Sequence, residues 1–181
     1  FATLHPMRYL IVTPLFPPDT APAAAYSKEL AHRLRAGDAE VTVLLYGHLP
    51  ETVSDATLIP IDKRRSAPLR LAAFTRKLVA LLRTSDHCFA VNGPSTELPL
   101  LIASHLSRTP FTLILCDTPA TARWYRFIHH RLRARATSVI ETDARSLLRP
   151  EIMPLQPRPE TALAHFDDAW QRHCRDLTMT V

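Results

Sequence analysis

The segment from residue 7 to residue 46 constrains the fold most, because it contains the pattern of a strand, a loop, a helix and a second strand. Residues 9–13 form an apolar run of strand type, and a proline-rich loop follows over residues 14–22. Small and apolar residues then recur at helical spacing until Gly37. Residues 41–46 are again apolar and rich in β-branched side chains, as in a strand buried on both faces of a parallel sheet. We therefore predict a βαβ unit.

The same alternation continues along the chain. The apolar patterns predict strands at residues 57–61, 85–91, 111–116 and 137–141, and helices at residues 69–82, 97–106, 121–135 and 143–148. Strands that alternate with helices predict a mainly parallel sheet with helices on both faces. We expect an α/β, Rossmann-like fold.

The C-terminal part has a different composition. Prolines at positions 150, 154, 157 and 159 predict an extended connector. A final helix is expected from residue 160 to residue 178, and it should pack back on the domain. We predict three parts: a domain at residues 7–149, the connector at 150–159 and the C-terminal helix at 160–178. The stripe that would face the domain consists of Leu163, Phe166, Ala169, Trp170, His173 and Leu177.

Composition limits the function. The 181 residues include 16 Pro but only 3 Gly, so a glycine-rich phosphate loop is nearly excluded, and we expect no cofactor. Three widely spaced cysteines predict a reducing compartment and no metal site. No apolar run approaches the ~20 residues of a membrane-spanning helix, and no signal peptide is recognisable. These features predict a cytoplasmic protein.

Short motifs in the first unit are specific enough to suggest a family. The loop reads Phe16-Pro17-Pro18-Asp19, the helix carries Tyr26 and Glu29-Leu30-Ala31, and residues 40–44 read Glu-Val-Thr-Val-Leu. This pattern resembles the N-terminal domain of GT-B glycosyltransferases of the family-4 type. The resemblance covers residues 7–148. One departure stands out: where the family has a glycine pair after the loop, this chain has Ala21, Pro22 and Ala23.

The resemblance implies a function in glycosyl transfer. In that family the N-terminal domain binds the acceptor, and a C-terminal domain with a glutamate-rich motif holds most of the nucleotide-sugar. Nothing after residue 148 matches that motif. The resemblance therefore implies the acceptor-side half of an enzyme, with a partner protein that supplies the donor site and a sugar or lipid-linked acceptor. The alternative is a non-catalytic binding or scaffold module that retains the fold. Catalysis by this chain alone is not expected.

Ligands of parallel sheets bind beyond the carboxyl ends of the strands, near the point where the strand order reverses. Polar residues at the predicted strand ends are therefore candidates for the site. A carboxylate or imidazole there could orient or deprotonate an acceptor hydroxyl. The catalytic candidates are Asp117, His48 and Glu141, and the ligand-binding candidates are Pro18, Asp19, Asn92, Gly93, Glu97 and Thr118.

Each candidate also has a structural explanation. Asn92-Gly93-Pro94 is a common turn sequence, and Ser95 or Thr96 with Glu97 could cap the next helix. Asp117 could cap the helix that follows it, and His48 could be a loop residue without a function. Glu141 could be a solvent-facing charge near a helix entrance.

The predicted helix at residues 121–135 is strongly basic. Its apolar side should carry Trp124, Phe127, Ile128 and Leu132, so the helix could contact an anionic membrane surface peripherally. The alternative is a sheet-covering helix with a solvated basic face. The formal charge of +5 lacks an accompanying nucleic-acid recognition motif, and no specific nucleic-acid binding is expected. The basic residues are Arg123, Arg126, Arg131, Arg133 and Arg135.

Overall fold

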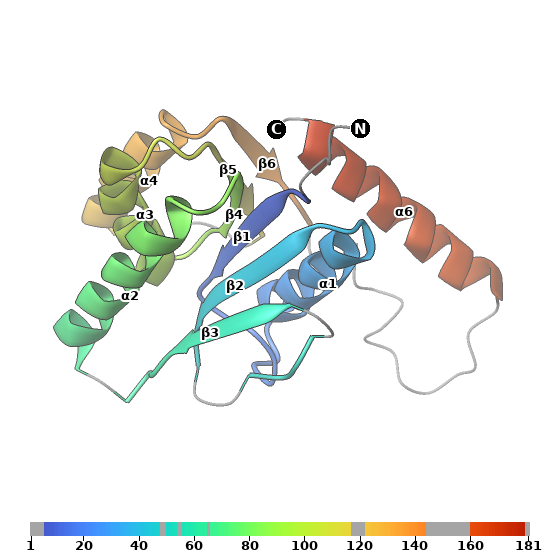
Figure 1. Cartoon of the computed structure of the whole chain (residues 1–181), viewed down its shortest axis with the longest axis horizontal. Coiled ribbons are helices and arrows are strands. Elements are labelled where there is room, and N and C mark those ends of the chain that lie inside the picture. The colour runs from blue at the N-terminus through green and yellow to red at the C-terminus, as the bar shows by residue number, and fades with distance from the viewer. Residues whose placement is uncertain are drawn as a thin grey trace.

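The computed structural model describes residues 6–47, 50–53, 56–64, 66–116, 122–143 and 160–179, and the side chains of the last helix from residue 166 onward. These residues form one open parallel sheet with helices on both faces (Figure 1). The strands are β1 (Arg8–Thr13), β2 (Glu40–Tyr46), β3 (Thr57–Ile61), β4 (His87–Val91), β5 (Phe111–Leu115) and β6 (Ser138–Glu141). The helices are α1 (Pro22–Ala36), α2 (Ala67–Leu82), α3 (Pro94–Leu106), α4 (Arg123–Arg133) and α6 (Glu160–Met179).

The strand order is β3-β2-β1-β4-β5-β6, and all five pairings are parallel. The first three strands build outward in one direction, and the chain then returns to the other side of β1 to form β4. The order therefore reverses between β1 and β4, which is the switch point of a doubly wound sheet. The predicted Rossmann-like α/β fold and the βαβ unit at residues 7–46 are confirmed.

Two helices begin earlier than predicted, and α2 starts at Ala67 rather than at residue 69. Helix α3 starts at Pro94 rather than at residue 97, and Gly93 is its N-cap without a side-chain capping bond. The Thr96 hydroxyl donates to the carbonyls of Val91 and Gly93, so it lies inside the helix. The suggestion that Ser95 or Thr96 caps this helix is therefore wrong. Proline fits the first turn of a helix because its missing N–H has no partner there.

Alternate residues of the strands point to two separate cores. One core lies under α1 and α6, where Ile11, Val43 and Phe89 pack against the helices. The other lies under α2, α3 and α4, where Leu10, Leu44 and Leu113 face the opposite side. This alternation follows from the two-residue period of a strand. Both faces are apolar, which explains the continuous apolar runs in the sequence.

Helix α6 packs against α1, as predicted from its stripe (Figure 1). Phe166, Trp170 and Leu177 are all buried. The Tyr26 hydroxyl of α1 lies 2.7 Å from Nε2 of His173, and the Tyr26 and Trp170 rings are 5.4 Å apart. The domain boundaries at residues 149 and 160 remain predictions, because the connector and the helix expected at 143–148 fall mostly outside the described residues.

Helix α4 shows a different face from the predicted one. Ile128 and Leu132 are buried, but Trp124 is 56% exposed and Phe127 is 60% exposed. The prediction that Trp124 and Phe127 share one apolar side with Ile128 and Leu132 is therefore wrong. The buried stripe also contains Tyr125 and His129, which have the spacing of one helix face. The Tyr125 hydroxyl and Nδ1 of His129 have a partner in the interior, so this stripe can pack against the protein although it looks polar in sequence.

Among the described residues, none of the helices combines the length and the apolar character needed to cross a lipid bilayer. In the same part of the chain, no three His, Cys, Asp or Glu side chains gather closely enough to hold a metal ion.

Candidate functional site

A cleft of about 450 Å³ opens at the carboxyl end of β1 and β4, beside the switch point of the sheet. This is the place where open α/β sheets bind ligands, and its volume lies within the usual range for ligand sites. The walls come from the ends of four strands and from α2, α3 and α4. The lining residues are Pro14, Leu15, Tyr46, Lys63, Arg70, Asn92, Gly93, Pro94, Ser95 and Tyr125.

The loop after β1 and the start of α3 approach each other closely in this cleft. A Cβ atom built on Gly93 would lie 2.9 Å from Cγ of Pro14 and 3.2 Å from its Cβ. Only glycine fits without displacement of the β1 loop. Tyr46 at the end of β2 donates its hydroxyl to the Ser95 carbonyl at 3.0 Å, which links a second strand end to α3.

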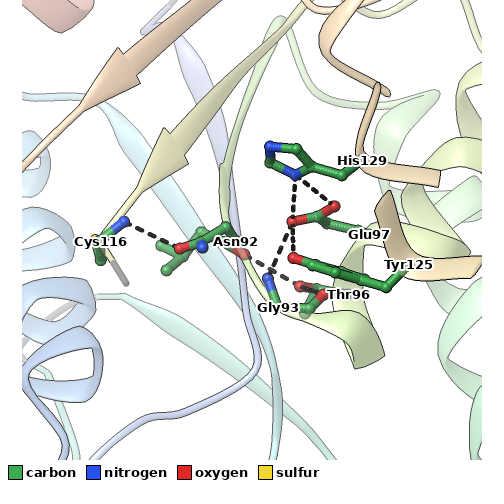
Figure 2. Close-up of polar contacts among 8 residues, drawn as sticks. Asn92, Gly93, Thr96, Glu97, Cys116, Tyr125 and His129 are labelled. Carbon is green, nitrogen blue, oxygen red and sulfur yellow. Dashed lines mark hydrogen bonds and ion pairs between the residues drawn. The ribbon is translucent and has the colours of Figure 1, made fainter. Parts of the chain in front are cut away.

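Asn92 connects the ends of β4 and β5. Its Oδ1 accepts the backbone N–H of Cys116 at 3.0 Å (Figure 2). The backbone N–H of Asn92 donates to the Ile114 carbonyl at 2.9 Å. The amide side chain therefore replaces a ladder hydrogen bond where β5 ends. Asn92 is itself buried, so its first role is to hold the floor of the cleft.

A buried carboxylate lies next to this floor. Glu97 is only 1% exposed, and its Oε1 accepts the Tyr125 hydroxyl at 2.5 Å and the Gly93 N–H at 3.3 Å (Figure 2). Nδ1 of His129 lies 3.0 Å from Oε2 of the same carboxylate. Burial, together with the hydrogen bond to Glu97, raises the pKa of Tyr125 above its ordinary value. Figure 2 shows Tyr125 and His129 reaching the carboxylate from the neighbouring helix α4.

This cluster, Glu97 with Tyr125 and His129, explains the buried polar stripe of α4. A buried carboxylate is costly unless it receives hydrogen bonds, and here α4 supplies two of its partners. Within the described part of the chain, Nε2 of His129 is buried and has no hydrogen-bond partner. Glu97 therefore fixes the position of α4 and of the Gly93 backbone, and Tyr125 brings this cluster to the wall of the cleft.

Two cations also line the cleft. The Lys63 ammonium lies 2.8 Å from Oδ2 of Asp19, and Arg70 donates to the Lys63 carbonyl at 3.1 Å. The Arg70 guanidinium also lies 5.7 Å from the centre of the Tyr46 ring. Burial raises the pKa of Tyr46 to about 12, against the opposing effect of the Arg70 charge. Tyr46 therefore stays neutral at physiological pH.

A second cavity of about 360 Å³ adjoins the cleft and shares Lys63 with it. Among the predicted ligand-binding residues, Pro18 and Asp19 line this second cavity, whereas Asn92 and Gly93 line the cleft. Glu97 lies behind the wall. The lining residues of the second cavity are Phe16, Pro17, Pro18, Asp19, Leu45, Gly47, Pro50, Asp62, Lys63 and Arg64.

The structure does not place any of the predicted catalytic residues in the cleft or in the second cavity, within the described residues. The Glu141 side chain is 76% exposed, lies 3.7 Å from Arg133 and lines neither cavity. His48, Asp117 and Thr118 lie outside the described residues.

Sequence reasoning missed four residues of the site: Lys63, Arg70, Tyr125 and His129. Lys63 follows β3 by two positions, so the rule on strand ends could have found it. Arg70, Tyr125 and His129 lie on helices, and helical spacing alone cannot show that they face the cleft or Glu97.

The comparisons with solved structures support the fold. A structure of Anabaena Alr3699/HepE in complex with UDP and glucose matches with a TM-score of 0.55 and 17% identity, over 74% of this chain and 37% of that one. A UDP-N-acetylglucosamine 2-epimerase matches with a TM-score of 0.56 and 12% identity, over 83% of this chain and 46% of that one. The chain shares its Rossmann-like α/β fold with part of each of these proteins. It spans less than half the length of either protein.

A third structure, described as MT0777, matches with a TM-score of 0.50 and 10% identity, over 83% of this chain and 100% of that one. No protein-family model matches the sequence, and no curated protein matches it either. At these identities the likeness concerns the fold alone.

Proposed function

We propose that this chain is the acceptor-side half of a GT-B glycosyltransferase of the family-4 type, and that it binds a sugar or lipid-linked acceptor in the cleft beside β1 and β4. The single observation that carries the proposal is the position of this cleft at the switch point of the sheet. The β1 loop that forms one wall continues into the Phe16-Pro17-Pro18-Asp19 motif of the resemblance. A cis peptide bond joins Pro17 and Pro18 within that motif.

The nucleotide-sugar would be bound by a donor domain on a partner protein. The chain spans 37% and 46% of the two glycosyltransferase-like proteins that it resembles in fold, which leaves room in such proteins for a second domain. The described residues around the cleft offer a single glycine, Gly93, and no run of open backbone N–H groups for a diphosphate.

A specific observation also favours the alternative, a binding or scaffold module without catalysis. Ala23 stands where the family has a glycine, and its side chain is completely buried at the start of α1. The Glu97 carboxylate is occupied by three hydrogen-bond partners, so it is not available as a base while these bonds persist. In this alternative, the cleft binds a sugar and no transfer follows.

Helix α4 supports a peripheral contact with an anionic membrane that carries a lipid-linked acceptor. Trp124 and Phe127 are exposed on a helix that is rich in arginine. Exposed aromatic rings beside cations suit the interface of an anionic bilayer. Tyr125 of the same helix lines the cleft, so a membrane on α4 would lie near the acceptor.

A binding experiment with a matched glycine pair tests the cleft. We expect methyl α-D-glucopyranoside to shift the amide NMR signals of Asn92, Gly93 and Ser95 in the native chain. Gly93→Ala should weaken this binding, because the added methyl group would meet Pro14 at 2.9 Å and displace the cleft wall. Gly37→Ala is the control, since the nearest atom to its Cβ is 3.5 Å away.

The same titration with UDP-glucose should give at most weak binding to the chain alone. If methyl α-D-glucopyranoside shifts signals only outside the cleft, the acceptor assignment is wrong. If UDP-glucose binds the isolated chain with micromolar affinity, no donor partner is needed.

A further inference from the structure

We propose that the cleft recognises a phosphorylated ligand, and that Lys63 and Arg70 bind its phosphate while the Tyr125 and Gly93 side holds the sugar. This inference rests on the proposed function and names the chemical class of the acceptor. The observation behind it is that both charged residues in the lining of the cleft are cations. They come from separate elements, the turn after β3 and the first turn of α2.

The contacts of Arg70 hold its guanidinium in place without neutralising it. It donates to a neutral acceptor, the Lys63 carbonyl, and it lies over the Tyr46 ring. Among the described residues, no carboxylate forms an ion pair with Arg70. A guanidinium has five N–H donors, so donors remain for an anion after the contact with Lys63.

Lys63 is partly neutralised, and the charges still favour an anion. Its ammonium pairs with Asp19, which belongs to the adjoining cavity. The two cations and this one carboxylate leave one net positive charge at the mouth of the cleft. An incoming phosphate could replace Asp19 as the partner of Lys63. Binding in the cleft would then also change the contacts of the loop with Pro17 and Pro18, which lines the second cavity. Glu97 contributes negative charge on the far side, behind Tyr125.

A sugar phosphate suits this division of the cleft. Its tetrahedral phosphate can accept bonds from an ammonium and a guanidinium that approach from different directions. The rest of the lining is mostly proline, leucine and tyrosine, which suits the apolar faces of a sugar ring. A volume of about 450 Å³ leaves room for a phosphate and a sugar unit together.

Calorimetry on the full chain tests the inference with three probes: D-glucose 1-phosphate, methyl α-D-glucopyranoside and inorganic phosphate. We expect glucose 1-phosphate to bind about ten-fold more tightly than the neutral glucoside, and its affinity to fall as salt rises. Arg70→Gln should remove most of this preference. Arg76→Gln is the matched control, because it removes the same charge from the same helix but lines a different, apolar groove of α2 and α3. A melting curve for each variant checks that it folds.

The outcomes separate the two proposals. Equal affinity for glucose 1-phosphate and the glucoside, unchanged by Arg70→Gln, would overturn the phosphate site and leave the acceptor function standing. Inorganic phosphate that binds as tightly as glucose 1-phosphate, and is lost in Arg70→Gln, would support the phosphate site and count against a sugar acceptor. Absence of binding by all three probes would overturn the phosphate site.

A second arm identifies the source of the phosphate. Cosedimentation with phosphatidylcholine vesicles that contain phosphatidylinositol should weaken in Arg70→Gln, relative to Arg76→Gln, if a lipid headgroup presents the phosphate. If the two variants sediment alike while only Arg70→Gln loses glucose 1-phosphate, the phosphorylated ligand is a soluble sugar phosphate.

Discussion

Helices α4 and α6 each carry one tryptophan and one phenylalanine, yet they use them in opposite ways. In α6, Trp170 is 0% exposed and its ring packs with that of Tyr26 of α1. In α4, Trp124 and Phe127 point to solvent, and a polar stripe around Tyr125 and His129 is buried instead. The difference shows that the side of a helix that packs against the domain depends on the residues of the domain that it contacts. For α4 that partner is the Glu97 carboxylate.

The two cores, one on each face of the sheet, therefore have different sources of stability. Beneath α6 the contacts are mainly aromatic and aliphatic, and their contribution grows with the apolar area that they remove from water. Beneath α4, aliphatic packing is combined with a hydrogen-bonded carboxylate. Aromatic rings left outside on α4 are available for another surface, which is where we propose the membrane contact.

The largest difference between the two helices is expected when their tryptophans are replaced. Trp170→Ala should lower the free energy of unfolding by about 3–5 kcal/mol, because it removes a fully buried side chain and leaves a cavity between α6 and α1. Trp124→Ala, the same substitution on α4, should change stability by less than about 0.5 kcal/mol. Urea denaturation of both variants measures the difference. Similar losses in the two variants would contradict the contrast between the helices.

Acid should weaken the α6 side through His87, which lies on β4 with its ring 4.9 Å from that of Phe89. Burial lowers the pKa of His87 from 6.5 to about 4. The unfolded chain therefore binds more protons between these values, and stability should fall as the pH drops from about 6.5 toward 4, by up to about 3 kcal/mol.

Unfolding measured from pH 7 to pH 4 checks this, with His87→Asn as the comparison. The variant should lose most of the pH dependence, although it will be less stable at pH 7, where the bond between His87 and Thr112 is present. An unchanged slope in His87→Asn would assign the acid sensitivity to other groups, of which His173 is one, because burial also lowers its pKa.

The smallest effect on stability is expected from the double variant Trp124→Ala and Phe127→Ala. Both side chains are exposed, so the free energy of unfolding should stay within about 0.5 kcal/mol of the native value. Binding to vesicles with anionic lipid should nevertheless fall several-fold, because the interfacial anchors are lost while the arginines remain. Cosedimentation measures this. Unaltered vesicle binding would exclude these rings as a membrane anchor.

The strands and the parallel sheet followed from the residues more reliably than the site did. The apolar run at residues 41–46 is buried wherever it is placed in a parallel sheet, so its pattern was enough to predict β2. The stripe around Phe166 and Trp170 likewise predicted the buried face of α6, since no other face of that helix is apolar enough. Strand ends such as Asn92 and Gly93 could be named because the edge of the sheet brings them together.

The spacing of apolar residues in the sequence determined the α/β class, the βαβ unit and the ends of the strands by itself. These features depend on periods of two and 3.6 residues within short segments. Tertiary structure decided which face of α4 is covered, and it brought Arg70 and Tyr125 to the same cleft. Both outcomes depend on contacts between residues far apart in the chain, such as Glu97 with Tyr125 and His129. A buried carboxylate requires donors from its neighbours, and this requirement made a polar stripe the inner face of α4.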